Sequence, residues 1–390
     1  MDEADRIYLD HNATAPLRPE AFAAMAPYLR EQHGNPSSPG WSGRLAKEAV
    51  VRARSEVADL IGAQPSEILF TSGATESIHQ AILGALELSP DRPRVVSTAV
   101  EHPSTALLLE RLEGRGVEVV RVPVDHEGRL DLGYLERALD KPAALLSLVW
   151  VNNETGVLSP VERAVGLAKE KGTLCHLDAA QAVGKIPVDA RALPFDLLSF
   201  SAHKLGGPKG IGVLFVRKGV CLPPLFCGHQ ERGRRGGTEN VAAIAGFGIA
   251  ARLAASGLAE RSRAVGRLRD RLEEEILLSL PDGAKVHGRQ CPRVANTTSI
   301  QFGRIDGEEL LARLEQRGIE ASLGSACSSG GGEPSRILLA MGLSAQEAGA
   351  TLRFSLGRET TIEEVERAAR GIVEEASVLI KAQTGEGPVG

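Results

Sequence analysis

The stretch Asp196-Leu-Leu-Ser-Phe-Ser-Ala-His-Lys-Leu-Gly-Gly-Pro-Lys-Gly210 passes from an apolar run into a glycine-rich turn. Leu197–Ser201 predicts a buried strand, because it is short and apolar and a turn signal follows it. Lys204 stands just beyond the end of this strand, so its amine is expected at the edge of a sheet. In α/β proteins such an edge is where ligands bind.

Six further short runs, rich in β-branched or apolar residues, predict strands of the same sheet. They are Glu67–Thr71, Arg94–Ala99, Val117–Val122, Ala144–Val151, Thr173–Leu177 and Gly212–Val216. Helix-length amphipathic segments separate most of them. This alternation indicates an α/β fold with a mainly parallel seven-stranded sheet and connections over both faces.

A second, smaller unit is expected after the sheet. From about Glu239 the chain has a helical pattern, and a charged periodic segment continues to Leu272 as a long connector. Strands are predicted near Ala295–Phe302 and at Thr351–Ser355, and an amphipathic helix over residues 361–380. These elements indicate a smaller α+β domain.

Composition excludes several classes of function. The 390 residues are 43% hydrophobic with a net charge of -5, which gives an ample core and no basic field for nucleic acid. The acidic opening Met1-Asp-Glu-Ala-Asp5 is unlike a secretory signal, and the longest apolar run, Ala143–Val151, is too short to cross a bilayer. The five cysteines include no C-x-x-C pair, so neither a disulfide framework nor a zinc knuckle is predicted. We expect a cytoplasmic protein with reduced thiols that binds neither nucleic acid nor a membrane.

The segment Gly246-Phe-Gly-Ile-Ala-Ala251 matches the spacing of a dinucleotide-binding fingerprint. It lies in a helical run, however, with no strand before it and no acidic residue near position 266. We therefore interpret these glycines as residues that let helices pack closely.

Lys204 and Asp178 together favour chemistry on a pyridoxal ring. A lysine with reduced hydration has a lowered pKa and is nucleophilic enough to form a Schiff base. Asp178 ends the fifth strand in Leu174-Cys-His-Leu-Asp-Ala-Ala-Gln181, where a carboxylate can keep a pyridinium nitrogen protonated and make the ring an electron sink. The ordinary alternatives are a solvated surface charge for Lys204 and a helix cap for Asp178.

A phosphate site is predicted in Phe70-Thr-Ser-Gly-Ala-Thr-Glu-Ser77, which passes from strand through glycine to helix. The amides of Ala74 and Thr75, with the Thr75 hydroxyl, would face an anion at the helix N-terminus. Thr238, in Arg234-Arg-Gly-Gly-Thr-Glu-Asn240, offers a second hydroxyl. Taken singly, each threonine fits a helix cap better.

Cys327 is the candidate nucleophile for sulfur chemistry. It lies in Ser322-Leu-Gly-Ser-Ala-Cys-Ser-Ser-Gly-Gly-Gly-Glu-Pro334, whose three successive glycines and four serines predict a loop with no apolar face. A thiol on a solvent-exposed loop can ionise, act as a nucleophile and carry a covalently bound group, whereas a structural cysteine is normally buried and inert. The alternative is a free cysteine that happens to lie in a loop.

Four further motifs accompany Lys204, Asp178, Thr75 and Cys327. They are Tyr8-Leu-Asp-His-Asn-Ala-Thr14, Gly34-Asn-Pro-Ser-Ser38, Val151-Asn-Asn-Glu-Thr-Gly156 and Gln230-Glu-Arg-Gly-Arg-Arg-Gly-Gly-Thr-Glu-Asn240. In this order they resemble the cysteine desulfurases of the NifS/IscS type, which are class V aminotransferases. The resemblance implies a homodimeric pyridoxal-phosphate enzyme with an aspartate aminotransferase-like fold. A large cofactor domain would span residues 14–258, and residues 1–13 with 259–390 would form a small domain that carries the Cys327 loop.

The same resemblance implies a role for each candidate residue. Lys204 would hold the cofactor as a Schiff base, His102 in Val100-Glu-His-Pro103 would stack on the ring and move protons, and Cys327 would take the sulfur. The implied cofactor-binding residues are Ala74, Thr75, His102, Asn153, Asp178, Gln181, Ser201, His203, Lys204 and, across a dimer, Thr238. Asn153 and Arg353 would contact the substrate, whose carboxylate suits the guanidinium fork. The alternatives are a satisfied loop histidine and an exposed strand arginine.

The implied reaction converts L-cysteine to L-alanine and leaves a persulfide on Cys327. The sulfur would then pass to a scaffold or acceptor protein for iron–sulfur cluster assembly or thiolation. As a soft thiolate, Cys327 is also a candidate for a transient contact to an iron–sulfur cluster.

Two other functions stay open. A selenocysteine lyase, or another pyridoxal-phosphate lyase or transaminase of this fold, needs Lys204 and Asp178 but not Cys327. A non-enzymatic sulfur carrier or cluster scaffold needs Cys327 but not Lys204.

Overall fold

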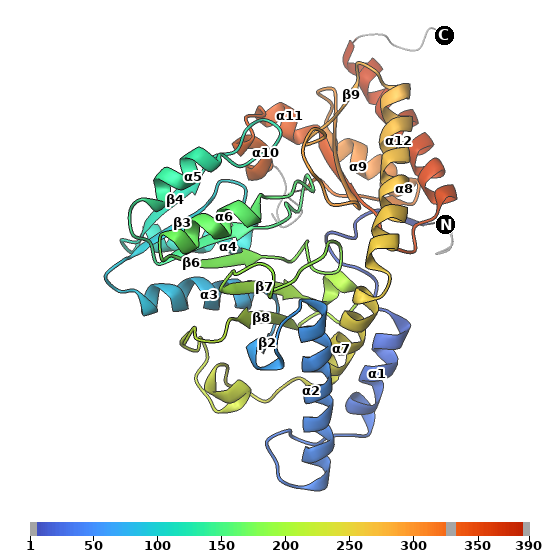
Figure 1. The fold of residues 1–390 in the computed structure, drawn as a ribbon. Helices are drawn as coiled ribbons and strands as arrows, with labels where there is room; N and C mark the ends of the chain where they lie inside the picture. Colours follow the sequence, from blue (N-terminus) through green and yellow to red (C-terminus); the bar gives the residue numbers. More distant parts are fainter. Residues whose placement is uncertain (1–5, 325–332, 385–390) are drawn as a thin grey trace.

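The computed structural model describes residues 6–324 and 333–384 of the chain. Its main body is a seven-stranded sheet with helices around it (Figure 1). In their order across the sheet the strands are β2 (Ile68–Thr71), β8 (Gly212–Val216), β7 (Leu197–Ser201), β6 (Leu174–Asp178), β5 (Leu145–Val149), β3 (Arg94–Thr98) and β4 (Glu118–Val122). β8 runs antiparallel to its neighbours β2 and β7, and the other pairs are parallel. The predicted α/β fold is confirmed, and the bounds of each predicted strand are correct to within two residues.

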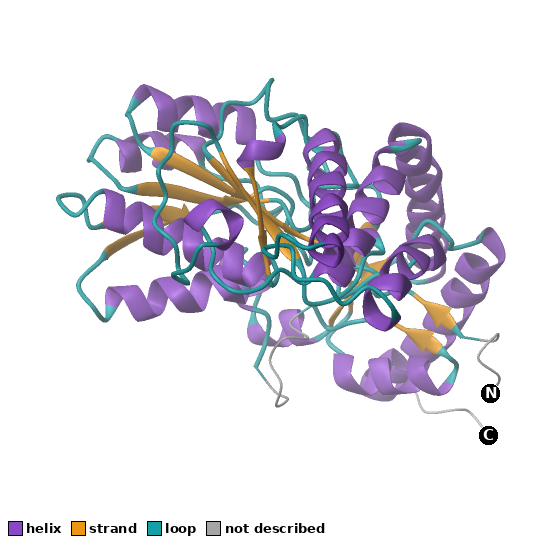
Figure 2. Cartoon of the chain, turned by 90° about the horizontal axis from the view of Figure 1, so that it is seen from below, coloured by secondary structure: helices purple, strands orange, loops and turns teal. Residues whose placement is uncertain are grey.

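Helices cover both faces of the sheet, as Figure 2 shows from below. They are α2 (Trp41–Leu60), α3 (Ala74–Leu88), α4 (Pro103–Glu113), α5 (Leu132–Leu139), α6 (Val161–Glu170) and α7 (Val241–Ala255). α3 and α4 pack on one face, around Leu69, Val95 and Leu197. The other four helices pack on the opposite face, around Val96 and Leu198. Because neighbouring strand residues point to opposite faces, this double burial explains why the strands are continuous apolar runs.

The second unit combines residues from both ends of the described chain. Its elements are β1 (Ile7–Tyr8), α8 (Leu258–Ser279), β9 (Ala284–Val286), β10 (Thr297–Phe302), α9 (Gly307–Gln316), β11 (Ile319–Glu320), β12 (Thr351–Ser355) and α12 (Ile362–Thr384). β12, β10 and β9 form an antiparallel sheet, and β1 pairs in parallel with β11. Ile7 and Leu9 are buried in the same core as Phe302 and Phe354. β10, β12 and α12 match the sequence prediction, whereas β1, β9 and β11 did not emerge from it.

Two short helices, α10 (Arg336–Ala340) and α11 (Ala345–Gly349), pack against the first unit. Ile337, Leu338 and Met341 share a small apolar cluster with Val100 and Val149. Val149 ends β5, so these helices lie next to the edge of the main sheet where strands end.

The predicted connector consists of two helices, α7 and α8, with a bend of 77° between them. Gly257 at the break has a φ of +64°, a conformation that glycine adopts without strain. The bend turns the chain from the first unit into the second (Figure 1). Within the described ranges no single helix has the length and apolar composition to cross a membrane, and only the bent pair α7 and α8 meets those criteria jointly.

Gly246 and Gly248 lie inside α7, with no strand before them. A Cβ atom on Gly246 would lie 2.6 Å from Cγ of Met25 in α1 (Pro19–Arg30). One on Gly248 would lie 2.7 Å from Cα of Ala53 in α2. The interpretation of this segment as close helix packing is therefore confirmed.

We expect Gly248→Ala to lower the free energy of unfolding by about 1–3 kcal/mol, because the new methyl group must push α2 away. Gly166→Ala in α6 is the matched control, since a Cβ atom there meets nothing within 4 Å. It should instead raise the free energy of unfolding by about 0.5–1 kcal/mol. Urea denaturation of the two variants tests this, and equal stabilities would contradict it.

Candidate active site

A cavity of about 420 Å³ opens at the edge of the main sheet where β2, β5, β6 and β7 end. Nine of the residues predicted from the sequence line it. They are Ala74, Thr75, His102, Asn153, Asp178, Gln181, Ser201, His203 and Lys204. The topology produces this convergence, because these four strands run in the same direction and the loops that follow them meet at one edge.

Lys204 lies on a short 3₁₀ helix, Ala202–Leu205, directly after β7. Its Nζ donates a hydrogen bond to the carbonyl oxygen of Ala13 at 2.7 Å and another to the carbonyl oxygen of Asn12. Gly206, with a φ of +77°, ends the helix. The amine of Lys204 therefore lies in the cavity because its helix follows β7 directly, and hydrogen bonds to Asn12 and Ala13 orient it.

Asp178 is the last residue of β6 and is 4% exposed. Its Oδ1 accepts a hydrogen bond from the Ala180 amide at 2.9 Å. Burial raises the pKa of Asp178 to about 6, and the Ala180 hydrogen bond and the charge of Lys204 oppose this shift. A cationic group in the cavity would stabilise the carboxylate form, so this position suits a protonated ring nitrogen.

His102 caps α4 and also lines the cavity. Its Nδ1 accepts a hydrogen bond from the Ser104 amide at 3.1 Å and lies 2.8 Å from the Ser104 hydroxyl. Burial, and after it the charges of Lys204 and Arg353, lower the pKa of His102 to about 4. The imidazole is therefore neutral near pH 7. Because Nδ1 is an acceptor, the ring carries its hydrogen on Nε2.

The N-terminus of α3 forms one wall of the cavity. The Ala74 amide donates a hydrogen bond to Ser201 Oγ at 2.7 Å, and no side chain caps the helix at Gly73. The N-cap position of α3 is Gly73, so Thr75, which is exposed on this wall, is not the cap. His203 lies 3.2 Å from Thr14 Oγ1 through Nδ1, and burial, with the charges of Lys204 and Lys209, lowers its pKa to about 4. Helix amides and hydroxyls of this kind suit a phosphate group.

Arg353 of the second unit lies next to the cavity, where it contacts the lining residue Asn153, and its guanidinium already has partners. Nη2 donates to Asp10 Oδ1 at 2.6 Å and Nη1 donates to the Asn153 carbonyl at 3.0 Å. Arg353 is 4% exposed, so it is not the exposed strand arginine that was its alternative. Within the described residues, Asn153 Oδ1 and Arg353 Nε are buried and have no hydrogen-bond partner. Such orphaned polar atoms beside a cavity suit a polar ligand.

Two predicted residues of the described ranges, Thr238 and Arg353, do not line this cavity. Thr238 lines an adjoining cavity of about 220 Å³, with Glu231 and Arg235. Arg235 in turn pairs with Glu76 of α3 at 3.0 Å. Cys327 lies outside the described residues, and so does its suggested contact to an iron–sulfur cluster.

Sequence reasoning gave no role to Asn12, which contacts both units. Its carbonyl accepts hydrogen bonds from Lys204 and Gln181, and its side chain bonds Thr297 at 2.9 Å. Lys185 Nζ donates to Asn12 Oδ1 at 2.7 Å. The motif Tyr8-Leu-Asp-His-Asn-Ala-Thr14 contains this residue, but the motif alone did not indicate which of its side chains would contact both units.

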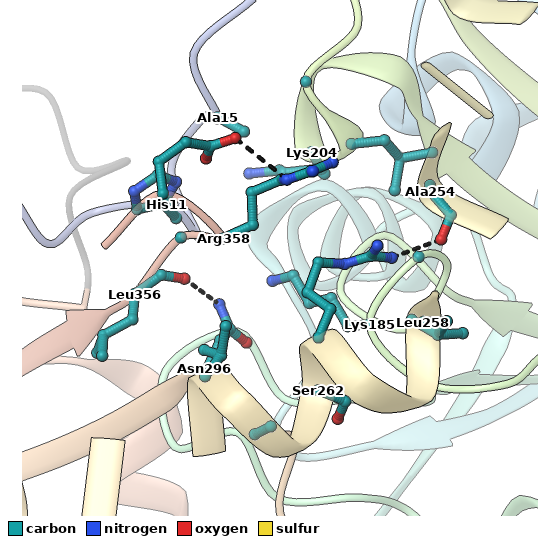
Figure 3. Close-up of a pocket in the computed structure, with 18 of the residues that line it drawn as sticks. His11, Ala15, Lys185, Lys204, Ala254, Leu258, Ser262, Asn296, Leu356 and Arg358 are labelled. Atoms are coloured by element: carbon teal, nitrogen blue, oxygen red, sulfur yellow. Dashed lines mark hydrogen bonds and ion pairs between the residues drawn. The ribbon is translucent and has the colours of Figure 1, made fainter. Parts of the chain in front are cut away.

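Lys185 is half-buried behind this edge of the sheet, and the sequence gave no sign of its position. Its amine also donates to Gln181 Oε1. Burial, followed by the charges of Lys204 and Arg353, lowers the pKa of Lys185 well below its usual value. Figure 3 shows Lys185, Lys204 and Asn296 around a second cavity of about 120 Å³, so Lys204 lies between two cavities.

Residues 7–368 match the model of the family Aminotransferase class-V. The chain belongs to the class V aminotransferases. It is 47% identical over 366 residues to a cysteine desulfurase of Cereibacter sphaeroides, covering 93% of this chain and 94% of that protein. It is 45% identical over 388 residues to the cysteine desulfurase NifS of Azotobacter vinelandii, covering 98% of this chain and 96% of that protein. The predicted resemblance to NifS-type cysteine desulfurases is confirmed.

Solved structures agree with this membership. A NifS-like protein superposes with a TM-score of 0.89 at 35% identity, covering 96% of this chain and 100% of that one. A structure described as SspA in complex with cysteine superposes with a TM-score of 0.80 at 31% identity, covering 91% of this chain and 99% of that one. Both superpositions cover more than nine-tenths of this class V aminotransferase.

Class V aminotransferases use pyridoxal 5'-phosphate, and the cavity of this member fits that group. The uncapped N-terminus of α3 suits the phosphate, and the buried acid Asp178 suits the ring nitrogen. Lys204 supplies the amine, and the orphaned Asn153 Oδ1 supplies a free acceptor. Each chemical part of the cofactor thus has a matching group in the cavity.

Glu101, next to His102, is a buried acid that sequence reasoning missed. Its Oε1 accepts hydrogen bonds from Thr98 Oγ1 at 2.6 Å and from the Val149 amide at 2.9 Å. Its Oε2 has no partner among the described side chains and backbone groups. Burial raises the pKa of Glu101 to about 8, although the two hydrogen bonds oppose the shift. An acidic residue at the end of an apolar strand was the signal that could have located it.

Because the pKa of Glu101 is higher in the folded than in the unfolded protein, the folded state holds this proton longer as pH rises. The stability of the parent should therefore fall, relative to Glu101→Gln, between about pH 5 and about pH 8 and then level off. The comparison isolates Glu101, since every other titrating group is common to both proteins. Thermal unfolding of the cofactor-free proteins across this range measures it, and parallel curves would refute it.

Proposed function

We propose that this chain is a pyridoxal-phosphate-dependent cysteine desulfurase that transfers the sulfur of L-cysteine to Cys327. The observation that carries the proposal is the meeting of Lys204, Asp178 and His102 in one cavity of a chain whose relatives are cysteine desulfurases. The likeness to SspA, whose structure is described with bound cysteine, supports cysteine as the substrate. The products would be L-alanine and a Cys327 persulfide.

We assign the cofactor-holding residues by their place in the cavity. Ala74, Thr75, Ser201 and His203 would hold the phosphate, Asp178 the ring nitrogen and Gln181 the ring oxygen. His102, with a neutral imidazole, would stack on the ring, and Asn153 would lie beside it. When bound, the cofactor supplies an electron sink that stabilises negative charge at the substrate α-carbon. Lys204 would remove and return the proton at that carbon, assisted by His102.

Arg353 would orient the substrate through its carboxylate. The guanidinium presents a fork that matches a carboxylate geometrically, and Asp10 already occupies part of it. Binding of L-cysteine would therefore exchange one carboxylate partner of Arg353 for another and release the carboxylate of Asp10, whose side chain is 16% exposed.

Cys327 would complete the reaction as a thiolate. It attacks the substrate sulfur, so an S–S bond forms as the bond between that sulfur and the β-carbon breaks. The electron pair of the broken bond goes to the β-carbon, which gains a proton and yields alanine. The sulfur then leaves on Cys327 for a scaffold or acceptor protein.

The wider setting is also a proposal. We propose a homodimer, in which Thr238 joins the cavity of the partner subunit. Large apolar side chains that are exposed in the single chain support a dimer. Phe226, near the Thr238 segment, is 49% exposed, and Trp41 is 70% exposed.

We also propose a division of the chain into a large domain, residues 14–258, and a small domain, residues 1–13 with 259–390. A reducing cytoplasmic compartment suits a thiol that must be free in every cycle.

The two halves of the proposed chemistry can be separated by substitution. Lys204→Ala should purify without the yellow absorbance of bound cofactor and release neither alanine nor sulfide. Cys327→Ala should stay yellow and bind L-cysteine, yet form no persulfide. Absorbance spectra, alanine assays and mass spectrometry of the Cys327 peptide provide the readouts. Sulfide release by Cys327→Ala at the parent rate would favour a lyase instead, and L-selenocysteine as a parallel substrate identifies which one.

The carboxylate role of Arg353 predicts a selective effect on KM. Arg353→Lys keeps the charge but loses the fork, so KM for L-cysteine should rise roughly tenfold or more. The absorbance of bound cofactor should not change, because Arg353 does not line the cofactor cavity in this structure. Steady-state kinetics with a cofactor titration decides the matter, and an unchanged KM would remove Arg353 from the substrate site.

A further inference from the structure

The segment that carries Cys327 has two described flanks, and both meet one buried acid. Gly324 precedes residues 325–332, and Glu333 to Ser335 follow them. Glu154 lies between the flanks, in the turn after β5, and is 4% exposed. Neither the sequence motif nor the assigned reaction steps give this carboxyl group a task.

The following flank is attached to Glu154 by a hydrogen bond. Ser335 Oγ donates to Glu154 Oε2 at 2.5 Å and accepts from the Leu338 amide at 3.2 Å. Ser335 is thereby the N-cap of α10. That helix is anchored on Val100 and Val149, beside the cavity, so the flank has a fixed position.

The preceding flank passes directly over the same carboxyl group. A Cβ atom on Gly324 would lie 2.9 Å from Glu154 Oε2, and Gly324 has a φ of +76°. Its amide donates to Ser322 Oγ at 3.2 Å. Ser322 in turn exchanges two backbone hydrogen bonds with Arg353, at 3.1 and 2.6 Å. This flank is therefore tied to the residue proposed to hold the substrate carboxylate.

The carboxyl group is not needed to form its own turn. Asn152 Oδ1 accepts hydrogen bonds from the amides of Glu154 and Thr155 at 3.0 Å each, so it closes the turn without the Glu154 side chain. Burial raises the pKa of Glu154 to about 7, against the Ser335 hydrogen bond and the charge of Arg353. A buried acid is unfavourable unless its contacts repay the lost hydration. Here its contacts are the two flanks.

We propose that Glu154 is a positioning residue for sulfur transfer, which holds both ends of the Cys327 segment beside Arg353. The inference rests on the proposed function, because it assumes that Cys327 receives the sulfur. Its role is to fix the two described flanks of this segment beside Arg353, so it affects persulfide formation rather than substrate binding.

Four variants of the cofactor-loaded full chain separate this role from a structural one. Glu154→Leu and Ser335→Ala each remove the bond between the acid and α10. Glu154→Gln keeps an acceptor oxygen for Ser335 and is the rescue variant. Ser344→Ala is the matched control, because Ser344 caps the neighbouring helix α11 in the same way but contacts neither flank.

Two signals are followed after L-cysteine is added. The first is the change in the visible absorbance of bound pyridoxal phosphate, which reports substrate binding. The second is the rate of persulfide formation on Cys327, measured by mass spectrometry of the alkylated protein. Glu154→Leu and Ser335→Ala should slow the second signal roughly tenfold and leave the first within about twofold of the parent. Glu154→Gln and Ser344→Ala should match the parent in both.

Persulfide formation by Glu154→Leu at the parent rate would overturn the inference, and so would a Glu154→Gln variant as slow as Glu154→Leu. If Glu154→Leu does not fold, Ser335→Ala decides by the same signals, since it leaves the acid in place. A parent protein that binds L-cysteine but forms no persulfide would instead refute the proposed function.

Discussion

The hydrogen bonds of Asn12 join the two units at the cavity, and the geometry of the site depends on them. The Asn12 carbonyl accepts from Lys204 and Gln181 of the first unit, while its side chain bonds Thr297 and its amide bonds Ser355 of the second. Buried polar groups must be paired, so neither unit can shift without leaving donors or acceptors unsatisfied. A single backbone segment therefore sets the position of the lysine relative to the strand that carries Arg353, the residue proposed to bind the substrate.

Burial also shifts the pKa values of several groups around the cavity towards their neutral forms. The pKa values of Glu101 and Asp178 are raised to about 8 and about 6, whereas that of His102 is lowered to about 4. Burial is the largest cause in each case, because the charged form loses its hydration. A charged ligand can then change the pKa values of these groups and form hydrogen bonds with them. A cation beside Asp178 would lower the raised pKa of this group and hold it as the carboxylate, and the amides at the N-terminus of α3 can donate hydrogen bonds to an anion.

Much of this architecture could be predicted from sequence, because periodicity and strand-end motifs are local properties. The strands were found to within two residues, and nine proposed site residues do share one cavity. β1 and β11 were missed because two residues are too few to show a pattern. The hydrogen bond from Arg353 to Asp10, and that from Lys185 to Asn12, join segments that lie far apart in the chain. No local pattern reports which carboxylate a distant arginine will meet.

The pairing of β1 with β11 has a consequence for biosynthesis. Ile7 pairs in register with Ile319, so β1 has no partner strand until the chain has been made as far as β11. The main sheet, by contrast, uses strands between Ile68 and Val216 and can assemble during translation. In the order of translation β1 therefore pairs later than the strands of the main sheet. Truncated chains that lack β11 would carry Lys204 without the strand pairing that fixes the segment around Asn12.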